Sequence, residues 1–455
     1  MSEESGRSQT IDDCRAGHCG PAAVNVFDEH HPPSAELISD CVHCGFCLAT
    51  CPTYVLWREE MDSPRGRIYL MDLALKNEVE LTPTCVDHFD KCLGCMACLT
   101  ACPSGVQYDK LIEATRSQIE RRFDRSWSDR IFRRMLFELF PHPGRLKALA
   151  LPLWFYQRTG LRSLAHATGL LRLLPARLAA MERLLPPVRL RSVNVSGVRP
   201  SGKEPRLRVG MLTGCVQRVF FGQANEATVR VLAAEGCEVV VPAGQGCCGA
   251  LMLHSGREQE AIGLAKRLID AFEAANVDRI VINAAGCGST MKEYAHLLRD
   301  EPDYAGRAAA FSEKCRDVTE LLVELGEPVA RRHPVPIKVA YHDACHLRHA
   351  QRVSDPPRQL LRAIPQLELL EIEESAICCG SAGVYNLLEP EAATELGDRK
   401  AANIIATGAE AVVTGNPGCL LQVRVALERA GRALPVLHTV ELIDASIQGV
   451  GVSGE

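Results

Sequence analysis

From residue 206 onward, short apolar runs alternate with longer stretches whose apolar residues recur at helical spacing. The short runs have the length of strands and lie at 206–215, 237–241, 280–283, 337–345, 367–372 and 411–414. Stretches such as 226–234 and 260–274 have the periodicity of helices. Strands that alternate with helices predict α/β units with parallel sheets, in which ligand sites form where loops leave the carboxyl ends of strands.

This region contains two copies of one pattern. Four cysteines follow the strands of each copy, and matching cysteines are 130 to 132 residues apart. They are Cys215, Cys247, Cys248 and Cys287 in the first copy, and Cys345, Cys378, Cys379 and Cys419 in the second. Four cysteines do not keep a nearly constant offset by chance, so the region is an internal repeat. We therefore predict two tandem α/β domains at 206–330 and 331–455, with their thiols at strand ends.

Residues 121–205 have a different pattern, that of short helices rich in leucine and arginine. Apolar segments at 131–140, 146–156 and 161–185 are separated by prolines, and between 126 and 191 the acidic residues are Asp129, Glu138 and Glu182. Short basic amphipathic helices can lie on an anionic membrane surface or pack on protein. Because the prolines interrupt a continuous apolar face, we favour packing and predict a basic helical linker region at 121–205.

Residues 35–120 carry a doubled run of cysteines, each with the spacing C-x2-C-x2-C-x3-C-P. The runs are Cys41, Cys44, Cys47, Cys51 and Cys92, Cys95, Cys98, Cys102. This is the spacing of two-cluster bacterial ferredoxins, in which the fourth cysteine of each run ligates the other cluster, whereas zinc sites typically use C-x-x-C pairs. We therefore expect two 4Fe-4S clusters. One is predicted on Cys41, Cys44, Cys47 and Cys102, and the other on Cys92, Cys95, Cys98 and Cys51.

The segment 62–67, which lies between the two cysteine runs, contains two arginines. Arg65 and Arg67 near anionic clusters would raise the reduction potential, or they bind carboxylates and helix ends; the sequence leaves both readings open. Residues 1–34 are polar and without periodicity, which predicts a flexible arm. Its Cys14, His18 and Cys19 lack the repeated spacing of a strong metal site.

Composition narrows the class of protein. The chain has 455 residues and a net charge of −5, which by itself indicates neither a nucleic-acid nor a membrane partner. Twenty-one cysteines in a chain of this length do not resemble a short secreted disulfide scaffold, and cluster ligands must be thiolates, so we expect a reducing cytoplasm. The sequence shows no signal peptide, no apolar run long enough to span a membrane and no nucleotide fingerprint, so any flavin is expected on another subunit.

Each copy at 206–455 resembles the cysteine-rich CCG domain of heterodisulfide reductases and of iron–sulfur subunits of respiratory dehydrogenases. With the two ferredoxin-type runs, the chain from about residue 35 resembles the iron–sulfur subunits of glycolate oxidase. The segments Ser63-Pro-Arg-Gly-Arg-Ile-Tyr-Leu70 and Cys102-Pro-Ser-Gly-Val106 carry this resemblance. It implies a multidomain fold, with an α-helical two-cluster ferredoxin-like domain, a helical linker and two tandem α/β CCG domains.

The resemblance also implies a function. The chain would be the electron-transfer subunit of a membrane-associated flavin-dependent 2-hydroxyacid (glycolate) dehydrogenase. It would take electrons from an FAD-binding partner subunit and pass them to quinone, with no substrate-oxidising site of its own and no nucleic-acid partner. It would be cytoplasmic, with peripheral contact on the inner face of the cell membrane as an open point. The alternatives are a heterodisulfide-reductase-like subunit, the corresponding subunit of a lactate or glycerol-3-phosphate dehydrogenase, and a scaffold without metal.

The CCG copies depart from the heterodisulfide reductase pattern, because Thr290 and Gln422 stand where its last cysteine would be. Four thiolates per copy still suffice for one cluster, although adjacent cysteines such as Cys378 and Cys379 are awkward ligands for one cube. We expect a further cluster in at least one copy, the alternative being a set of buried structural thiols. His342 and His346 flank Cys345, where they either tune such a centre or are hydrogen-bonded in the core.

Overall fold

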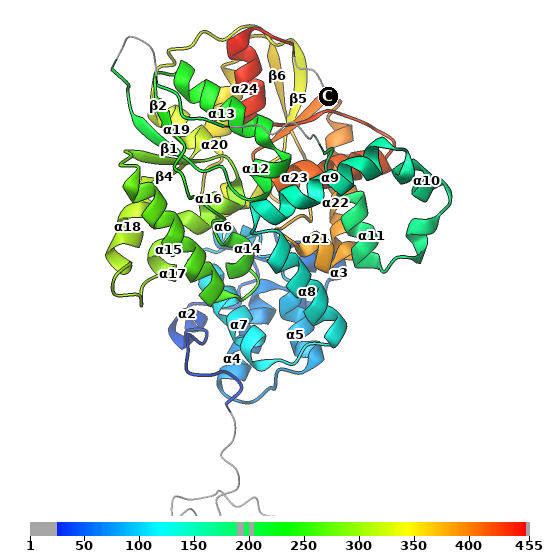
Figure 1. Cartoon of the computed structure of the whole chain (residues 1–455). Helices are drawn as coiled ribbons and strands as arrows, with labels where there is room; N and C mark the ends of the chain where they lie inside the picture. The colour runs from blue at the N-terminus through cyan, green and yellow to red at the C-terminus, as the bar shows by residue number, and fades with distance from the viewer. Residues whose placement is uncertain (1–24, 189–194, 200–203, 452–455) are drawn as a thin grey trace, which may run out of the picture.

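The computed structural model describes residues 25–188, 195–199 and 204–451, and Figure 1 shows their arrangement. A helical domain built from the N-terminal third lies at one end, and the two α/β domains lie at the other, with the linker helices along one side. None of the helices in the described ranges is long and apolar enough to cross a membrane.

The N-terminal domain consists of short helices whose starts are fixed by the local sequence. They are α2 (Ala35–Ser39), α3 (Pro52–Trp57), the 3-10 turn η1 (Glu60–Asp62), α4 (Pro64–Leu75), α5 (Pro83–Asp90), α6 (Ala97–Ala101) and α7 (Tyr108–Arg122). The side chains of Ser34, Ser63 and Thr82 cap three of them, and proline occupies the first turn of α3, α4 and α5. The helical character expected here is confirmed, whereas a ferredoxin-like arrangement stays a prediction.

The described part of the N-terminal arm is not a free tail. Asp28 accepts hydrogen bonds from Gln118 and Arg121 on α7, and His31 contacts Glu258 of the first α/β domain. Asp28 and His31 of the predicted flexible arm therefore contact the folded domains, and flexibility of the arm over 1–34 stays a prediction. Cys14, His18 and Cys19 lie outside the described residues.

The linker region forms α8 (Trp127–Leu139), α9 (Pro143–Arg158), α10 (Leu161–Ala167), η2 (Leu170–Leu173) and α11 (Ala176–Arg183). Leu136, Phe137 and Leu146 are buried, and Leu136 and Phe137 belong to the core of the first α/β domain. Helix α9 also contacts α12 (Val216–Phe220), and α11 contacts α21 (Tyr385–Leu388). One side of the linker therefore packs on protein, as its prolines suggested.

Each α/β domain contains a four-stranded parallel sheet, as predicted. The orders are β2-β1-β3-β4 and β6-β5-β7-β8. The strands are β1 (Arg208–Met211), β2 (Glu238–Val240), β3 (Arg279–Ile282), β4 (Cys315–Asp317), β5 (Ile337–Tyr341), β6 (Leu367–Glu371), β7 (Ala411–Thr414) and β8 (Val436–His438). The identical orders confirm the internal repeat. Sequence patterning missed β4 and β8, because each has three residues, two of the three in β4 are charged, and neither strand lies in a longer apolar run.

Helices cover both sheets, and the two domains share one core. The longer ones are α13 (Gly222–Ala234), α15 (Glu258–Ala274), α22 (Pro390–Ala406), α23 (Pro417–Arg429) and α24 (Thr439–Gln448). Val209 and Val281 of the first sheet belong to the same buried cluster as Val339 and Val413 of the second. The two domains therefore join through a common apolar layer, in which helices such as α13 and α24 pack on one another, and this layer fixes the relative position of the domains.

Candidate metal centres

The first cysteine run lies in a loop before α3, near the protein surface. Cys41, Cys44 and Cys47 line a cavity together with Cys102, which directly follows α6. The side chains of Val42 and Phe46 in the same loop are 69% and 67% exposed. The structure therefore brings together the four thiols predicted for one cluster, and it leaves their loop open to solvent or to a partner.

The second run is deeply buried beside Cys51. Cys92, Cys95 and Cys98 are each at most 9% exposed, and Cys51 at the start of α3 is 6% exposed. Burial raises the pKa of Cys98, and the neighbouring thiols of Cys95, Cys92 and Cys51 raise it further. The fourth cysteine of each run thus lies with the other run's first three. This is the geometry that the spacing predicts, although which atoms ligate iron stays a prediction.

Positive charge and hydrogen-bond donors surround the second run. Arg67 is fully buried, and its guanidinium lies 3.3 Å from Thr53 Oγ1, which in turn lies 3.2 Å from Cys51 Sγ. The Tyr108 hydroxyl donates to Cys92 Sγ over 3.6 Å. Burial by itself would raise the pKa of Cys92, but Arg67 and Arg116 outweigh burial and lower that pKa. The thiolate form, which an iron–sulfur cluster requires, is therefore favoured at Cys92.

The two arginines of the Pro-Arg-Gly-Arg segment have different roles. Arg65 pairs with Glu60 at 2.6 Å and donates to the carbonyl of His43 in the first run, whereas Arg67 faces the second run. Between them, a Cβ at Gly66 would lie 2.0 Å from the Glu60 carbonyl oxygen, so only glycine fits there. Sequence reasoning left the roles of Arg65 and Arg67 open, and it missed Arg116, Thr53 and Tyr108, which no spacing pattern singles out.

The first α/β domain gathers its four predicted cysteines at the carboxyl ends of its strands. Cys215 follows β1, Cys247 and Cys248 follow β2, and Cys287 lies on α16 (Ala285–Lys292) after β3. Their thiols are neighbours in that order, and each influences the pKa of the next. Cys215, Cys247 and Cys248 are buried and Cys287 is partly buried.

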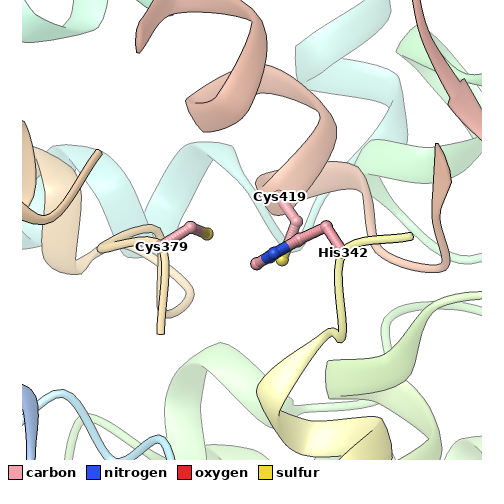
Figure 2. Close-up of side chains that lie close together, drawn as sticks. All are labelled: His342, Cys379 and Cys419. Atoms are coloured by element: carbon pink, nitrogen blue, oxygen red, sulfur yellow. The ribbon is translucent and has the colours of Figure 1, made fainter. Parts of the chain in front are cut away.

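The second α/β domain repeats this arrangement and adds a histidine. The thiols of Cys345 and Cys378, of Cys378 and Cys379, and of Cys379 and Cys419 are neighbours that influence one another's pKa, and all four cysteines are buried. The neighbouring Cys379 and His342 lower the pKa of Cys419 against the effect of burial. Figure 2 shows the His342 ring extending toward Cys379, with the Cys419 sulfur beside it. The Nε2 and Nδ1 donors of a histidine suit the same metals as thiolates do.

The second cysteine run lies against the second α/β domain. Cys95 belongs to one buried cluster with Cys345 and Cys378, and Cys378 is the charged neighbour that most raises the pKa of Cys95 after burial itself. The rings of His254 and His346, 5.0 Å apart, then connect the first α/β domain to the second. Cys47 of the first run in turn acts on the pKa of Cys98 in the second run, so three groups of sulfur atoms are contiguous: the two runs and the cysteines of the second α/β domain.

The donor sets fit iron–sulfur clusters. Sulfur atoms converge in groups of four, and every cysteine in the described part of the chain is free of disulfide bonds. Four thiols gathered at the strand ends of each α/β domain are also difficult to explain by packing alone, because strand ends of parallel sheets are where ligand sites form.

Comparison with known proteins agrees with this geometry. Residues 37–106 match the 4Fe-4S dicluster domain, residues 209–292 and 339–424 match the cysteine-rich CCG domain, and residues 128–185 match the linker region of glycolate oxidase iron–sulfur subunits. These matches, with the cysteine groups, show that the chain binds multiple iron–sulfur clusters. They also confirm the resemblance drawn from the sequence.

Relatives align over nearly the whole chain. A probable glycolate oxidase iron–sulfur subunit of Bacillus subtilis is 41% identical, with 94% of this chain and 97% of the relative covered. The glycolate oxidase iron–sulfur subunit of Escherichia coli is 36% identical, with 91% and 95% covered. Lactate utilization protein A of Oceanobacillus iheyensis is 30% identical over 53% of this chain and 99% of the relative.

Among solved structures, a hypothetical protein from Helicobacter pylori has a similar fold. The TM-score is 0.51 at 9% identity, with 85% of this chain and 68% of that chain covered. At this identity the similarity concerns the fold alone. The match to the linker region of glycolate oxidase iron–sulfur subunits, and the identity to two such subunits over nearly their whole length, show that the chain belongs to the family of glycolate oxidase iron–sulfur subunits.

Proposed function

We propose that this chain is the electron-transfer subunit of a membrane-associated, flavin-dependent glycolate dehydrogenase, and that it passes electrons from an FAD-binding partner to quinone. The observation that carries the proposal is the row of sulfur groups, from the exposed loop of Cys44, through buried Cys95, to Cys378 in the second CCG domain. When bound there, iron–sulfur clusters supply acceptance and donation of single electrons.

The protein's own residues would perform three tasks in this relay. The exposed Val42 and Phe46 offer an apolar contact surface next to the first cysteine run, where a flavoprotein could approach closely. Arg67 and Arg116 stabilise negative charge at the buried second run. Packing of Cys95 against Cys345 and Cys378 excludes water between the second run and the second CCG domain.

The outer side of the linker is the surface we assign to the membrane. Leu164, Leu170 and Leu173 are 58%, 58% and 81% exposed, and Arg158, Arg172 and Arg183 are exposed among them. The acidic side chains of this region are already paired. Asp129 binds Arg133 and Arg177, Glu138 binds Arg145, and Glu182 binds Arg162. An apolar surface with unbalanced positive charge suits the anionic surface of a membrane, in whose apolar interior quinone is dissolved.

The test is electron delivery in the assembled complex, purified without air together with its co-purifying subunits. Cys95→Ser should leave flavin reduction by glycolate intact and reduce quinone reduction to background. Cys237→Ser is the matched control, since Cys237 is fully buried but belongs to none of the sulfur groups. Unchanged quinone reduction in Cys95→Ser would refute the relay.

Substrate choice needs its own comparison, because a relative in the lactate utilization group aligns with half of this chain. Electron paramagnetic resonance during titration with glycolate, lactate or glycerol 3-phosphate would identify which donor reduces the centres. A complex reduced by lactate and not by glycolate would favour the alternative substrate. Cleavage of a disulfide substrate by the isolated chain would instead favour a heterodisulfide-reductase-like activity.

A further inference from the structure

The two CCG domains differ at one position beside their cysteines. His342 lies three residues before Cys345, and Leu212 lies at the same place before Cys215 in the first domain. Both side chains are buried, at 1% and 2% exposure, but Leu212 is part of an apolar core whereas His342 is polar. The repeat therefore carries an imidazole in one copy only, directly next to the thiols.

Among the described residues, neither ring nitrogen of His342 meets hydrogen-bond geometry with any partner, and both nitrogens are buried. The polar group beside the ring is the Cys419 thiol, whose pKa His342 lowers. Leaving a buried donor or acceptor unpaired costs about 1–3 kcal/mol. Two other buried histidines of this domain are fully satisfied: His349 contacts Thr100 and the Ala376 carbonyl, and His438 contacts the Val440 amide and the Asn283 carbonyl. The orphaned nitrogens of His342 thus indicate a binding role.

The groups that face the His342 ring are sulfur atoms. Its ligand atom and the sulfurs of Cys379 and Cys419 all lie within 4.8 Å of one another, and Figure 2 shows the three side chains converging. Ligands of one tetrahedral metal, with bonds of about 2.3 Å to sulfur and about 2.1 Å to nitrogen, lie slightly closer together than this. A small side-chain movement would place all three around a single metal atom.

We propose that His342 donates a ring nitrogen to the metal atom bound by Cys379 and Cys419 in the second CCG domain. The inference rests on the proposal that this domain holds a metal centre. The first domain would hold its centre with sulfur alone, since Leu212 has no donor atom. The second domain still has four cysteines, so His342 as a ligand would take the place of one of their thiolates; a neutral imidazole in that place makes an iron–sulfur centre easier to reduce. The second domain, next to Cys95, would therefore be the better electron acceptor of the two.

The test uses the full chain, purified without air from cells fed with ¹⁵N-histidine or with unlabelled histidine. Metal content is measured first. Pulsed electron paramagnetic resonance of the reduced protein should then show a directly coordinated histidine nitrogen, with the ¹⁴N coupling replaced by a ¹⁵N coupling on labelling. Where zinc occupies the site instead, X-ray absorption at the zinc edge should show one imidazole among sulfur ligands. This measurement needs no variant, so a folding defect cannot obscure it.

Three variants locate the nitrogen. His342→Leu, which copies the first domain, should remove the coupling. His342→Cys should retain the metal, remove the coupling and lower the reduction potential of one centre. His349→Gln is the control and should keep the coupling, because both nitrogens of His349 are already occupied by hydrogen bonds.

Three results would overturn the proposal: no coordinated histidine in the wild-type protein, a coupling that survives His342→Leu, or a metal content no greater than two cubanes hold. These results are independent of the relay. Loss of quinone reduction in Cys95→Ser would stand even if His342 binds nothing, and a histidine ligand would stand even if quinone is not the acceptor.

Discussion

The Thr100 hydroxyl lies 2.7 Å from Nδ1 of His349, across the boundary between the second cysteine run and the second CCG domain. Nε2 of the same ring lies 3.0 Å from the Ala376 carbonyl oxygen, so Nε2 carries the proton and Nδ1 accepts from the hydroxyl. Burial lowers the pKa of His349, which favours this neutral form. The bond holds the helix that contains Cys98 against the π-helix η3 (His346–Ala350) that follows Cys345.

Thr100→Val should therefore weaken the boundary between these domains. The substitution keeps the shape of the side chain but leaves Nδ1 of His349 unpaired, at a cost of about 1–3 kcal/mol. Thermal unfolding of the anaerobically purified protein should begin at a lower temperature. Thr168→Val is the control, since its hydroxyl bonds a neighbouring carbonyl at the exposed end of α10, where a change of no more than about 0.5 kcal/mol is expected. Equal effects of the two changes would contradict this role of Thr100.

Arg67→Met should destabilise the N-terminal domain strongly. It removes a buried cation that lies 3.4 Å from Asp62 and 3.3 Å from Thr53, and breaking a buried ion pair costs about 3–5 kcal/mol. His88 also lies 2.9 Å from Asp62, so we expect the lower end of this range. The reduction potential of the centre at the second run should fall as well, because positive charge near Cys92 is lost.

Arg65→Met provides the comparison for this change. Arg65 pairs with the partly exposed Glu60, so its loss should cost at most about 1 kcal/mol. Arg67→Lys should restore part of the potential, because it retains the charge, but not the full stability, because it lacks the guanidinium fork. Potentiometric titration and unfolding of the three variants check these expectations. A larger effect at Arg65 than at Arg67 would be inconsistent with them.

The two CCG domains should respond to pH in opposite ways through their helix caps. Asp317 caps α19 (Val318–Glu324), and burial raises its pKa from 3.8 to about 6. The folded protein therefore binds the Asp317 proton more tightly than the unfolded chain does. Protonated Asp317 adds about 3 kcal/mol to the free energy of unfolding at low pH, and this stabilisation is lost as the pH rises from about 4 to about 6. His438 caps α24, and burial lowers its pKa from 6.5 to about 4. Its contribution is present above about pH 6.5 and is lost as the pH falls toward 4.

Single substitutions should separate these two effects between pH 5 and 7.5. Relative to the wild-type protein, Asp317→Asn should gain stability as the pH rises, because asparagine keeps the cap to the Thr319 amide without a charge to desolvate. His438→Asn should lose stability relative to the wild-type protein over the same rise. Denaturant unfolding at several pH values measures both. Parallel pH profiles for the two variants and the wild-type protein would show that the caps do not titrate as described.

The linker surface should bind anionic lipid. The full complex should sediment with phosphatidylglycerol vesicles at low salt and much less with phosphatidylcholine vesicles, since charge and apolar contact act together. Combined replacement of Leu164, Leu170 and Leu173 by serine should abolish sedimentation. Val329→Ser is the control, because Val329 is 61% exposed but lies in a loop of the first CCG domain. Sedimentation that survives the leucine replacements would remove the linker from membrane contact.

Local sequence determined much of this protein. Cysteine spacing indicated the two ferredoxin-type runs, and a constant offset between cysteines such as Cys215 and Cys345 revealed the repeated α/β domains. Apolar periodicity located the longer strands, such as β5. These features are local: a strand, a helix or a ligand loop follows from residues that are close together along the chain.

The tertiary structure decided what depends on distant contacts. Sequence alone placed no residue opposite Arg67, did not show that Cys95 lies against Cys378, and left His342 equally suited to a core or a metal. It also missed β4 and β8. These strands are too short to show an alternation of apolar and polar residues, and they form because their backbones pair with those of β3 and β7. The physical reason is the same in each case. Charge, burial and unpaired nitrogens are properties of the surroundings of a side chain, and those surroundings come from other segments of the chain that only folding brings close.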